Sequence, residues 1–208
     1  QLLQDKDYLK DLLGTKYIRE NRLTAALKTF HSLDKVYWMN NYNAWERDLY
    51  NEYYAFDQNP FYTLKYTDEF IEHQEKFIVT KLSVTEHLVK FLNLANNPKN
   101  KDRDYYYFLV ANCYFNMSYQ GNSWMMRRYN SSSSYYEGYE NESYVDEREY
   151  RMKLKAIEYY QLASENAKTK QFDALCLRMI DYAQSNYPNE FSKLKATYPD
   201  YYADLSNC

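Results

Sequence analysis

Apolar residues recur at helical spacing from the start of the chain. Two consecutive stretches, joined by the polar "RENR" at 19–22, carry them three and four residues apart, which places them on one face of a helix. The first stretch contains Leu9, Leu12, Leu13, Tyr17 and Ile18, and the second contains Leu23, Ala26, Leu27, Phe30 and Leu33. The pattern predicts two amphipathic helices that are joined by a tight turn.

The same period continues along the chain and predicts further helices at about 38–56, 68–96, 104–118, 146–168 and 171–186, with a short final helix that ends near Tyr198. No stretch combines the alternation of a strand with a hairpin turn. The "NPF" at 59–61 is expected to be an extended exit from the helix before it, because a residue before proline avoids the helical conformation. The sequence therefore predicts an all-α fold.

A repeated unit is visible in the spacing of small and aromatic residues. In the first helix pair, Gly14 and Ala26 lie 12 residues apart across the turn, where two antiparallel helices approach most closely. A glycine inside a helix costs about 1 kcal/mol relative to alanine, so we expect Gly14 to serve this close approach. Tyr17 and Phe30 are expected to fill the space beside it.

A second copy of this unit is split by a long insertion. Its first-helix positions are Tyr107, Val110, Ala111 and Tyr114, and its second-helix positions are Ala156, Tyr160 and Ala163. We expect an inserted loop at about 119–145, with 119–129 ordered against the ligand groove of the array and the Ser-, Tyr- and acid-rich remainder mobile. A third, degenerate copy carries Phe172, Leu175, Cys176 and Met179.

These units resemble the tetratricopeptide repeat, a helix-turn-helix unit with small residues at the helix contact. Together with "YFNMSYQGNSW" and "NPF", they are similar to the tetratricopeptide-like region of large secreted or surface-anchored bacterial proteins of unknown function. The resemblance implies one domain over 1–208: a right-handed α-α superhelix of three to four antiparallel helix pairs. It also implies that the chain is the C-terminal part of a larger extracytoplasmic protein, in the periplasm or at the cell surface.

The resemblance also implies where a ligand binds. In such arrays the first helix of each pair lines a concave groove. Carried onto the second unit, this places Phe108, Asn112, Phe115 and Asn116 toward the groove, with Tyr119 and Trp124 at its rim. We expect Trp124 either to contact the ligand or to pin the inserted loop to the body of the domain.

Charge and hydropathy exclude two classes of function. The 26 Lys and Arg residues are mixed among 29 Asp and Glu residues, which argues against a nucleic-acid-binding surface. The mean hydropathy is −0.85, and the chain has no apolar run of the length that crosses a membrane. We therefore expect no nucleic-acid partner and no membrane span.

Residues for catalysis or metal binding are few. Glu69 and His73 share a helix face, and His87 follows in "VTEHLVKF", yet no complete set of metal ligands is recognisable. Cys113 and Cys176 are expected to be small buried hydrophobes. The 3 glycines of the chain leave little material for a phosphate loop or an oxyanion turn. We expect no catalytic residue, no metal and no cofactor.

Aromatic residues are the strongest functional signal, with 27 Tyr, 10 Phe and 3 Trp. Most of them are expected to fill gaps between helices, but Tyr and Trp also form binding surfaces for proteins or sugar rings. The sequence therefore favours a non-catalytic scaffold that binds a peptide or protein partner. The alternative is a surface carbohydrate-binding module that uses Tyr and Trp as stacking platforms.

Overall fold

The computed structural model of the chain describes residues 6–38, 59–62, 75–129, 145–184 and 191–206. Within these ranges the regular structure is entirely helical, as the sequence predicts, and no strand is present. The helices are α1 (Lys6–Arg19), α2 (Leu23–Phe30), α4 (Lys81–Asn96), α5 (Arg103–Asn116), the 3-10 helix η3 (Trp124–Met126), α6 (Val145–Met152), α7 (Leu154–Glu165), α8 (Lys170–Gln184), α9 (Ser192–Thr197) and α10 (Pro199–Ser206).

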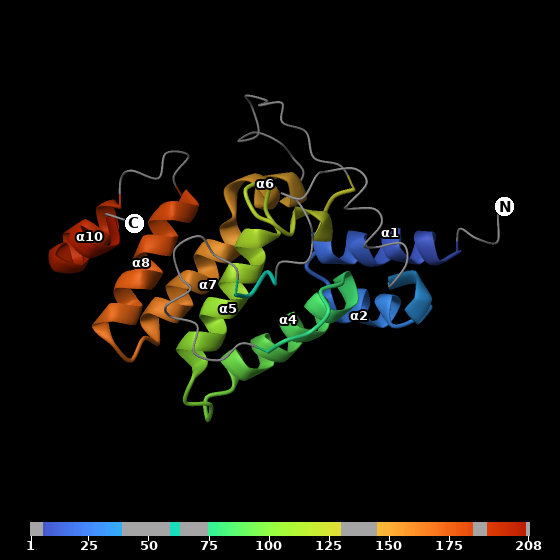
Figure 1. Cartoon of the computed structure of the whole chain (residues 1–208), viewed down its shortest axis with the longest axis horizontal. Coiled ribbons are helices and arrows are strands. Elements are labelled where there is room, and N and C mark those ends of the chain that lie inside the picture. Colours follow the sequence, from blue (N-terminus) through green and yellow to red (C-terminus); the bar gives the residue numbers. More distant parts are fainter. Residues whose placement is uncertain (1–5, 39–58, 63–74, 130–144, 185–190, 207–208) are drawn as a thin grey trace.

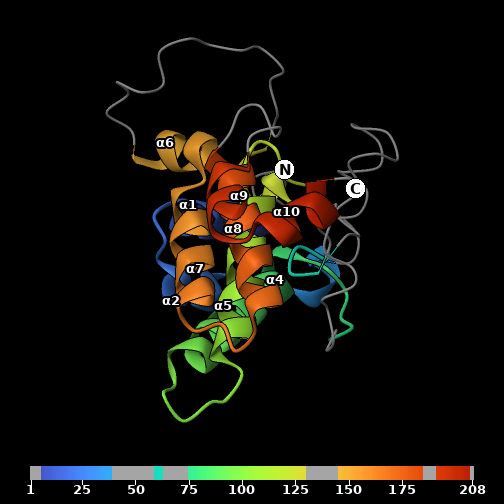
Figure 2. The same ribbon diagram turned by 90° about the vertical axis from the view of Figure 1, so that its left-hand side faces the viewer.

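The helices form an array in which neighbours in the sequence are neighbours in space. Figure 1 shows α1 and α2 at one end and α10 at the other, and Figure 2 views the array from the end at which α9 and α10 lie. α5 packs on α4 and on α7, and α7 packs in turn on α8. α6 lies across one end of α5 and α7 in both views. None of the helices in the described ranges has the length and apolar character needed to cross a membrane.

The first helix pair explains Gly14. A β-carbon at this position would overlap the ring of Phe30, which is fully buried on α2. The close approach therefore exists as the sequence predicts, although the nearest atoms belong to Phe30 and not to Ala26.

The second helix pair also forms, even though its two members are far apart in the sequence. α5 and α7 pack along their lengths, and the small residues expected at their contact, Ala111, Ala156 and Ala163, are fully buried. Tyr160 is buried among them. α5 and α7 are thus a packed helix pair, although residues 117–153 lie between them in the sequence.

The expected helix over 68–96 is wrong at 75–80, which are not helical. α4 starts one residue after Thr80, because Thr80 and Ser83 form a capping box. The Ser83 backbone N–H donates to Thr80 Oγ1 at 3.1 Å, and the Thr80 N–H donates to Ser83 Oγ at 2.9 Å. The structure does not describe residues 39–58 and 63–74. The expected helix over 38–56, except for position 38, and the start of the expected 68–96 helix therefore lie outside the described residues. The same is true of Glu69 and His73.

The expected helix over 146–168 is also interrupted. Lys153 adopts a left-handed backbone conformation with φ of 55°, which ends α6 and starts α7. Its buried side chain donates from Nζ to Gln120 Oε1 at 2.7 Å, and burial lowers the pKa of this amine to about 8. Near the C-terminus, Pro199 starts a further helix instead of ending the last one, since proline is well suited to the first helical position.

Candidate functional site

The centre of the array is α5, and it is buried on nearly all sides. Every residue from Tyr107 to Asn116 is buried. A helix that is buried all round makes contacts on each of its faces. Phe108 and Phe115 face α8, with ring centroids 5.4 Å from those of Phe172 and Tyr182, respectively.

Asn112 and Asn116 lie one helical turn apart on another face of α5, and both hold a backbone segment from elsewhere in the chain. Asn112 Nδ2 donates to the carbonyl oxygen of Phe61 at 2.8 Å, and Asn116 Nδ2 donates to that of Pro60 at 2.8 Å. The two asparagines are only 0% and 3% exposed. The Asn112 amide is fixed further because its Oδ1 accepts a hydrogen bond from the Tyr160 hydroxyl at 2.8 Å.

The segment that they hold, 59–62, is a turn. The Tyr62 N–H donates to the Asn59 carbonyl at 3.2 Å, and the Phe61 N–H donates to Asn59 Oδ1 at 3.0 Å. Asparagine in the first position and proline in the second are the residues that such a turn favours. The expected extended exit over 59–61 is therefore wrong. The turn bond uses the Asn59 carbonyl and leaves those of Pro60 and Phe61 to α5. Figure 1 shows this short segment beside α5.

The side chain of Phe61 enters an aromatic pocket that α4 and the segment before it build. Its ring meets Phe91 edge to face with centroids 5.0 Å apart. Phe77 and His87 complete the pocket, and their ring centroids lie 6.3 and 6.4 Å from that of Phe61. The two rings stack on each other with centroids 3.8 Å apart. Phe61 is 0% exposed. The pocket thus receives a whole ring and excludes water from it.

Tyr62 closes the turn against residues 75–80. Its hydroxyl oxygen accepts a hydrogen bond from the Glu75 backbone N–H at 3.1 Å. Burial raises the pKa of the Tyr62 phenol above its ordinary value, which disfavours the phenolate still further. We call the surface that holds the turn, formed by Asn112, Asn116, Phe77, His87 and Phe91, the turn receptor.

The loop after α5 is folded back over the end of that helix. A β-carbon on Gly121 would overlap the Asn116 backbone, and the Ser123 N–H donates to the Asn116 carbonyl at 2.8 Å. Gly121 is therefore required for a close approach to α5. Trp124 is only 2% exposed, and Tyr119 is half-buried beside Tyr150, whose carbonyl accepts its N–H at 3.3 Å.

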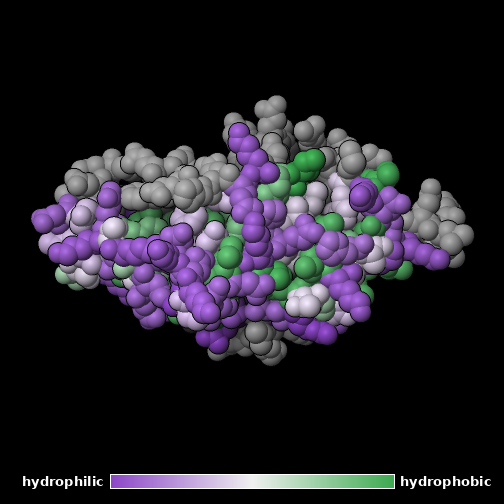
Figure 3. Space-filling view, turned by 90° about the horizontal axis from the view of Figure 1, so that it is seen from below, coloured by the Kyte–Doolittle hydropathy of each residue, from purple (hydrophilic) through white to green (hydrophobic). Residues whose placement is uncertain are grey.

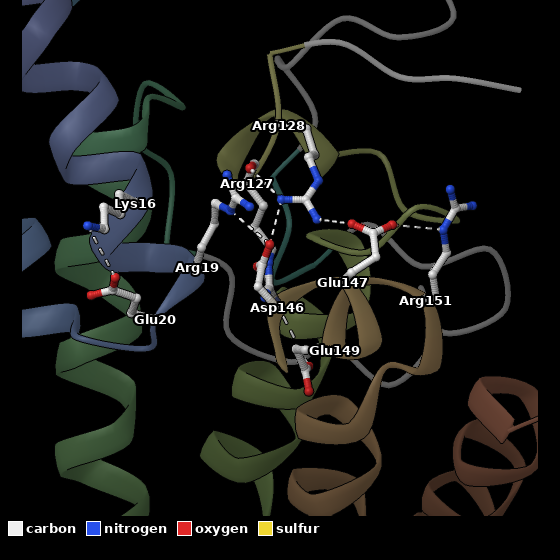
Figure 4. Close-up of polar contacts among 9 residues, drawn as sticks. All are labelled: Lys16, Arg19, Glu20, Arg127, Arg128, Asp146, Glu147, Glu149 and Arg151. Atoms are coloured by element: carbon white, nitrogen blue, oxygen red, sulfur yellow. Dashed lines mark hydrogen bonds and ion pairs between the residues drawn. The ribbon is translucent and has the colours of Figure 1, made fainter. Parts of the chain in front are cut away.

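Ion pairs fix the end of this loop to α6 and α1 (Figure 4). Arg127 and Arg128 reach Asp146 at 2.7 and 2.6 Å, and Arg19 of α1 reaches the same carboxylate at 2.8 Å. Arg128 also pairs with Glu147 at 2.5 Å. Burial works to raise the pKa of Asp146, but the hydrogen bonds and charge of the two loop arginines hold it below its usual range. Residues 119–129 are thus held against α5, α6 and α1 and not against the groove that the resemblance implies, whereas 130–144 lie outside the described residues.

A buried polar network attaches Tyr129, the last described residue before α6, to the first helix pair. Lys81 Nζ lies 3.0 Å from Asp11 Oδ1 and donates to Thr15 Oγ1 at 3.0 Å. The Tyr37 hydroxyl donates to Asp11 Oδ2 at 3.0 Å, and the Tyr129 hydroxyl lies 2.9 Å from Thr15 Oγ1. Each group has hydrogen-bonded partners, as buried charges require, so this network is a structural connection.

The six residues that the resemblance places at a groove do not share one surface. Asn112 and Asn116 lie together in the turn receptor, Phe108 and Phe115 face α8, and Tyr119 and Trp124 belong to the folded loop. Apart from half-buried Tyr119, all are buried. Sequence reasoning did not predict that 59–62 would occupy the asparagine face, although its Asn-Pro pair is a recognisable turn signal.

Other reactive groups in the described residues are occupied or buried. His87 Nδ1 lies 2.7 Å from the Ser83 carbonyl and its Nε2 lies 3.3 Å from Glu75, while His31 pairs with Glu86 at the surface. Cys113 and Cys176 are free and buried, as predicted, and burial raises the pKa of both thiols. Within the described ranges no group of three or more His, Cys, Asp or Glu side chains is arranged to hold a metal ion.

Comparison with family models, curated proteins and solved structures finds no match for this chain.

Proposed function

We propose that this chain is a non-catalytic helical-repeat scaffold that binds a peptide segment of a protein partner at the turn receptor. In this proposal the helix pairs form a right-handed superhelix of the tetratricopeptide-like kind, in an extracytoplasmic assembly. The observation that carries it is the pair of buried asparagines on α5, which donate to two consecutive backbone carbonyls.

Backbone recognition of this kind is a means of peptide binding. Carbonyl oxygens are common to all peptides, so donors spaced one helical turn apart hold a segment of main chain, and a neighbouring pocket selects its side chain. Asn112 and Asn116 supply the donors, and the ring pocket supplies the selection. Buried amides without acceptors would cost about 1 to 3 kcal/mol each, so this face needs a backbone segment, which residues 59–62 supply within the chain.

The carbohydrate alternative finds less support among the described residues. Trp38 and Trp124 are both buried, which removes them as stacking platforms for sugar rings, and Trp45 lies outside the described ranges. On the face shown in Figure 3, hydrophobic residues are scattered among hydrophilic ones. Peptide binding at α5 is therefore the function that we propose.

Selection from a random peptide library tests the proposal. The baits are the wild-type chain and Phe61→Ala, in which the resident turn is weakened. Asn116→Leu, introduced into each bait, is the control because it removes one donor and keeps the volume. We expect peptides whose affinity falls at least tenfold with Asn116→Leu. A folded Phe61→Ala bait that yields no binder dependent on Asn116 would overturn the proposal.

A further inference from the structure

The chain contains two Asn-Pro turns with the same internal hydrogen bonds. In 97–100 the Asn100 N–H donates to the Asn97 carbonyl at 3.0 Å, and the Lys99 N–H donates to Asn97 Oδ1 at 3.0 Å. Residues 59–62 repeat this pattern at 3.2 and 3.0 Å. Asn97, Pro98 and Lys99 are nevertheless exposed, whereas Pro60, Phe61 and Tyr62 are buried. Turn geometry alone therefore does not bring a segment to α5.

The difference between the turns defines what the receptor recognises. The third position is Phe in the buried turn and Lys in the exposed one, and only the ring fills the pocket beside Phe91. Proline in the second position has no N–H, so the receptor needs no acceptor at that point. The proline carbonyl accepts the hydrogen bond from Asn116. The ligand chemistry is thus an Asn-Pro-aromatic turn that presents two free carbonyls.

The described hydrogen bonds from the receptor to the turn run from α5 side chains to the main chain of the turn. One further bond runs from the Glu75 backbone N–H to the Tyr62 hydroxyl. None of them depends on the covalent connection of 59–62 to the helices around it. The turn is joined to the described helical body through residues 39–58 on one side and 63–74 on the other. A turn of the same chemistry from another chain would find the same donors and the same pocket.

We propose that the receptor recognises Asn-Pro-aromatic turns, and that the chain's own 59–62 is a resident ligand which a partner protein bearing such a turn displaces. This inference rests on the proposed function and names its ligand class. A ligand tethered within its own chain competes at an effective concentration on the order of millimolar. The wild-type chain therefore binds a free turn peptide weakly. When the resident turn is weakened, it competes less, and the free peptide binds more tightly.

The test compares two peptides and two forms of the chain. Fluorescently labelled "DQNPFYTL" (57–64) is titrated into the wild type and into Phe61→Ala, with "ANNPKNKD" (95–102) as the matched peptide that forms the turn without the ring. We expect Phe61→Ala to bind the 57–64 peptide at least tenfold more tightly than the wild type does, and at least tenfold more tightly than it binds the 95–102 peptide. Adding Asn116→Leu to Phe61→Ala should abolish this binding.

Two controls keep the outcome decisive. Circular dichroism first establishes that Phe61→Ala is folded; if it is not, Phe61→Leu, which keeps an apolar side chain but loses the ring, takes its place. Equal affinity for the two peptides, or no binding to a folded variant, overturns the inference. If library peptides still bind in an Asn116-dependent manner but share no Asn-Pro-aromatic sequence, the ligand class fails while the proposed function stands.

Discussion

The two Asn-Pro turns of this chain have one local structure and opposite surroundings. Residues 59–62 and 97–100 close with the same backbone bond and the same asparagine side-chain bond, yet only the first is buried against α5. The local sequence determines the shape of a turn. A ring in the third position, together with two amide donors more than 50 residues away in the chain, determines its location.

The largest expected effect is that of removing the ring. Phe61→Ala leaves a cavity among Phe77, His87 and Phe91 and should lower the free energy of unfolding by about 3 to 5 kcal/mol. Lys99→Ala, at the same position of the exposed turn, should change it by less than about 0.5 kcal/mol. Urea denaturation measures both. Equal effects would show that burial of the first turn contributes nothing.

Trp124→Ala separates ligand contact from loop packing. The side chain is buried, so its loss should lower the free energy of unfolding by about 3 kcal/mol. In the folded fraction, the affinity of Phe61→Ala for the 57–64 peptide should stay unchanged when Trp124→Ala is added. A tenfold loss of peptide affinity with unchanged stability would instead place Trp124 in the binding site.

Asn116→Leu tests the donors with a smaller expected effect. It leaves the Pro60 carbonyl without this buried donor and should lower the free energy of unfolding by about 1 to 3 kcal/mol. Asn100→Leu is the matched control, because Asn100 Nδ2 also donates to a carbonyl, that of Leu94 at 3.0 Å, at a half-buried position. Its cost should be below about 1 kcal/mol. If Asn100→Leu lowers the free energy of unfolding more than Asn116→Leu does, the buried donor on α5 contributes no more than a half-buried one.

The smallest expected effect is that of chelation. His87 forms a wall of the Phe61 pocket, stacked on Phe77, and its ring nitrogens face Ser83 and Glu75. EDTA should therefore leave the melting temperature unchanged. A fall of many degrees that zinc restores would assign His87 a role as a metal ligand.

The helical architecture could be predicted because it depends on local patterns. Apolar periodicity gave α1, α2, α5 and α8, and the spacing of Ala111, Ala156 and Ala163 indicated the split pair α5 and α7. The interruptions were harder to predict. The capping box at Thr80 starts α4, and the left-handed Lys153 separates α6 from α7. Neither boundary is marked by Gly or Pro, so the apolar spacing continues across both.

The candidate site was predictable only in part, for a physical reason. Asn112 and Asn116 were expected to face a groove, and both bind main chain. Their acceptors come from 59–62, and a contact of such long range leaves no periodic signal in the sequence. The pattern on α5 also does not reveal that Phe108 and Phe115 turn to α8, because a helix buried on every side has no polar face to orient it.

The side-chain amides of Asn112 and Asn116 provide the most direct test, since their hydrogen exchange can be followed by 15N NMR. In the wild type both should exchange slowly. In Phe61→Ala they should exchange much faster, and the 57–64 peptide should restore slow exchange while Asn100 stays unaffected. If the folded variant keeps the wild-type exchange rates, or if bound peptide leaves the faster rates unaltered, α5 does not read the backbone of a turn and the account is wrong.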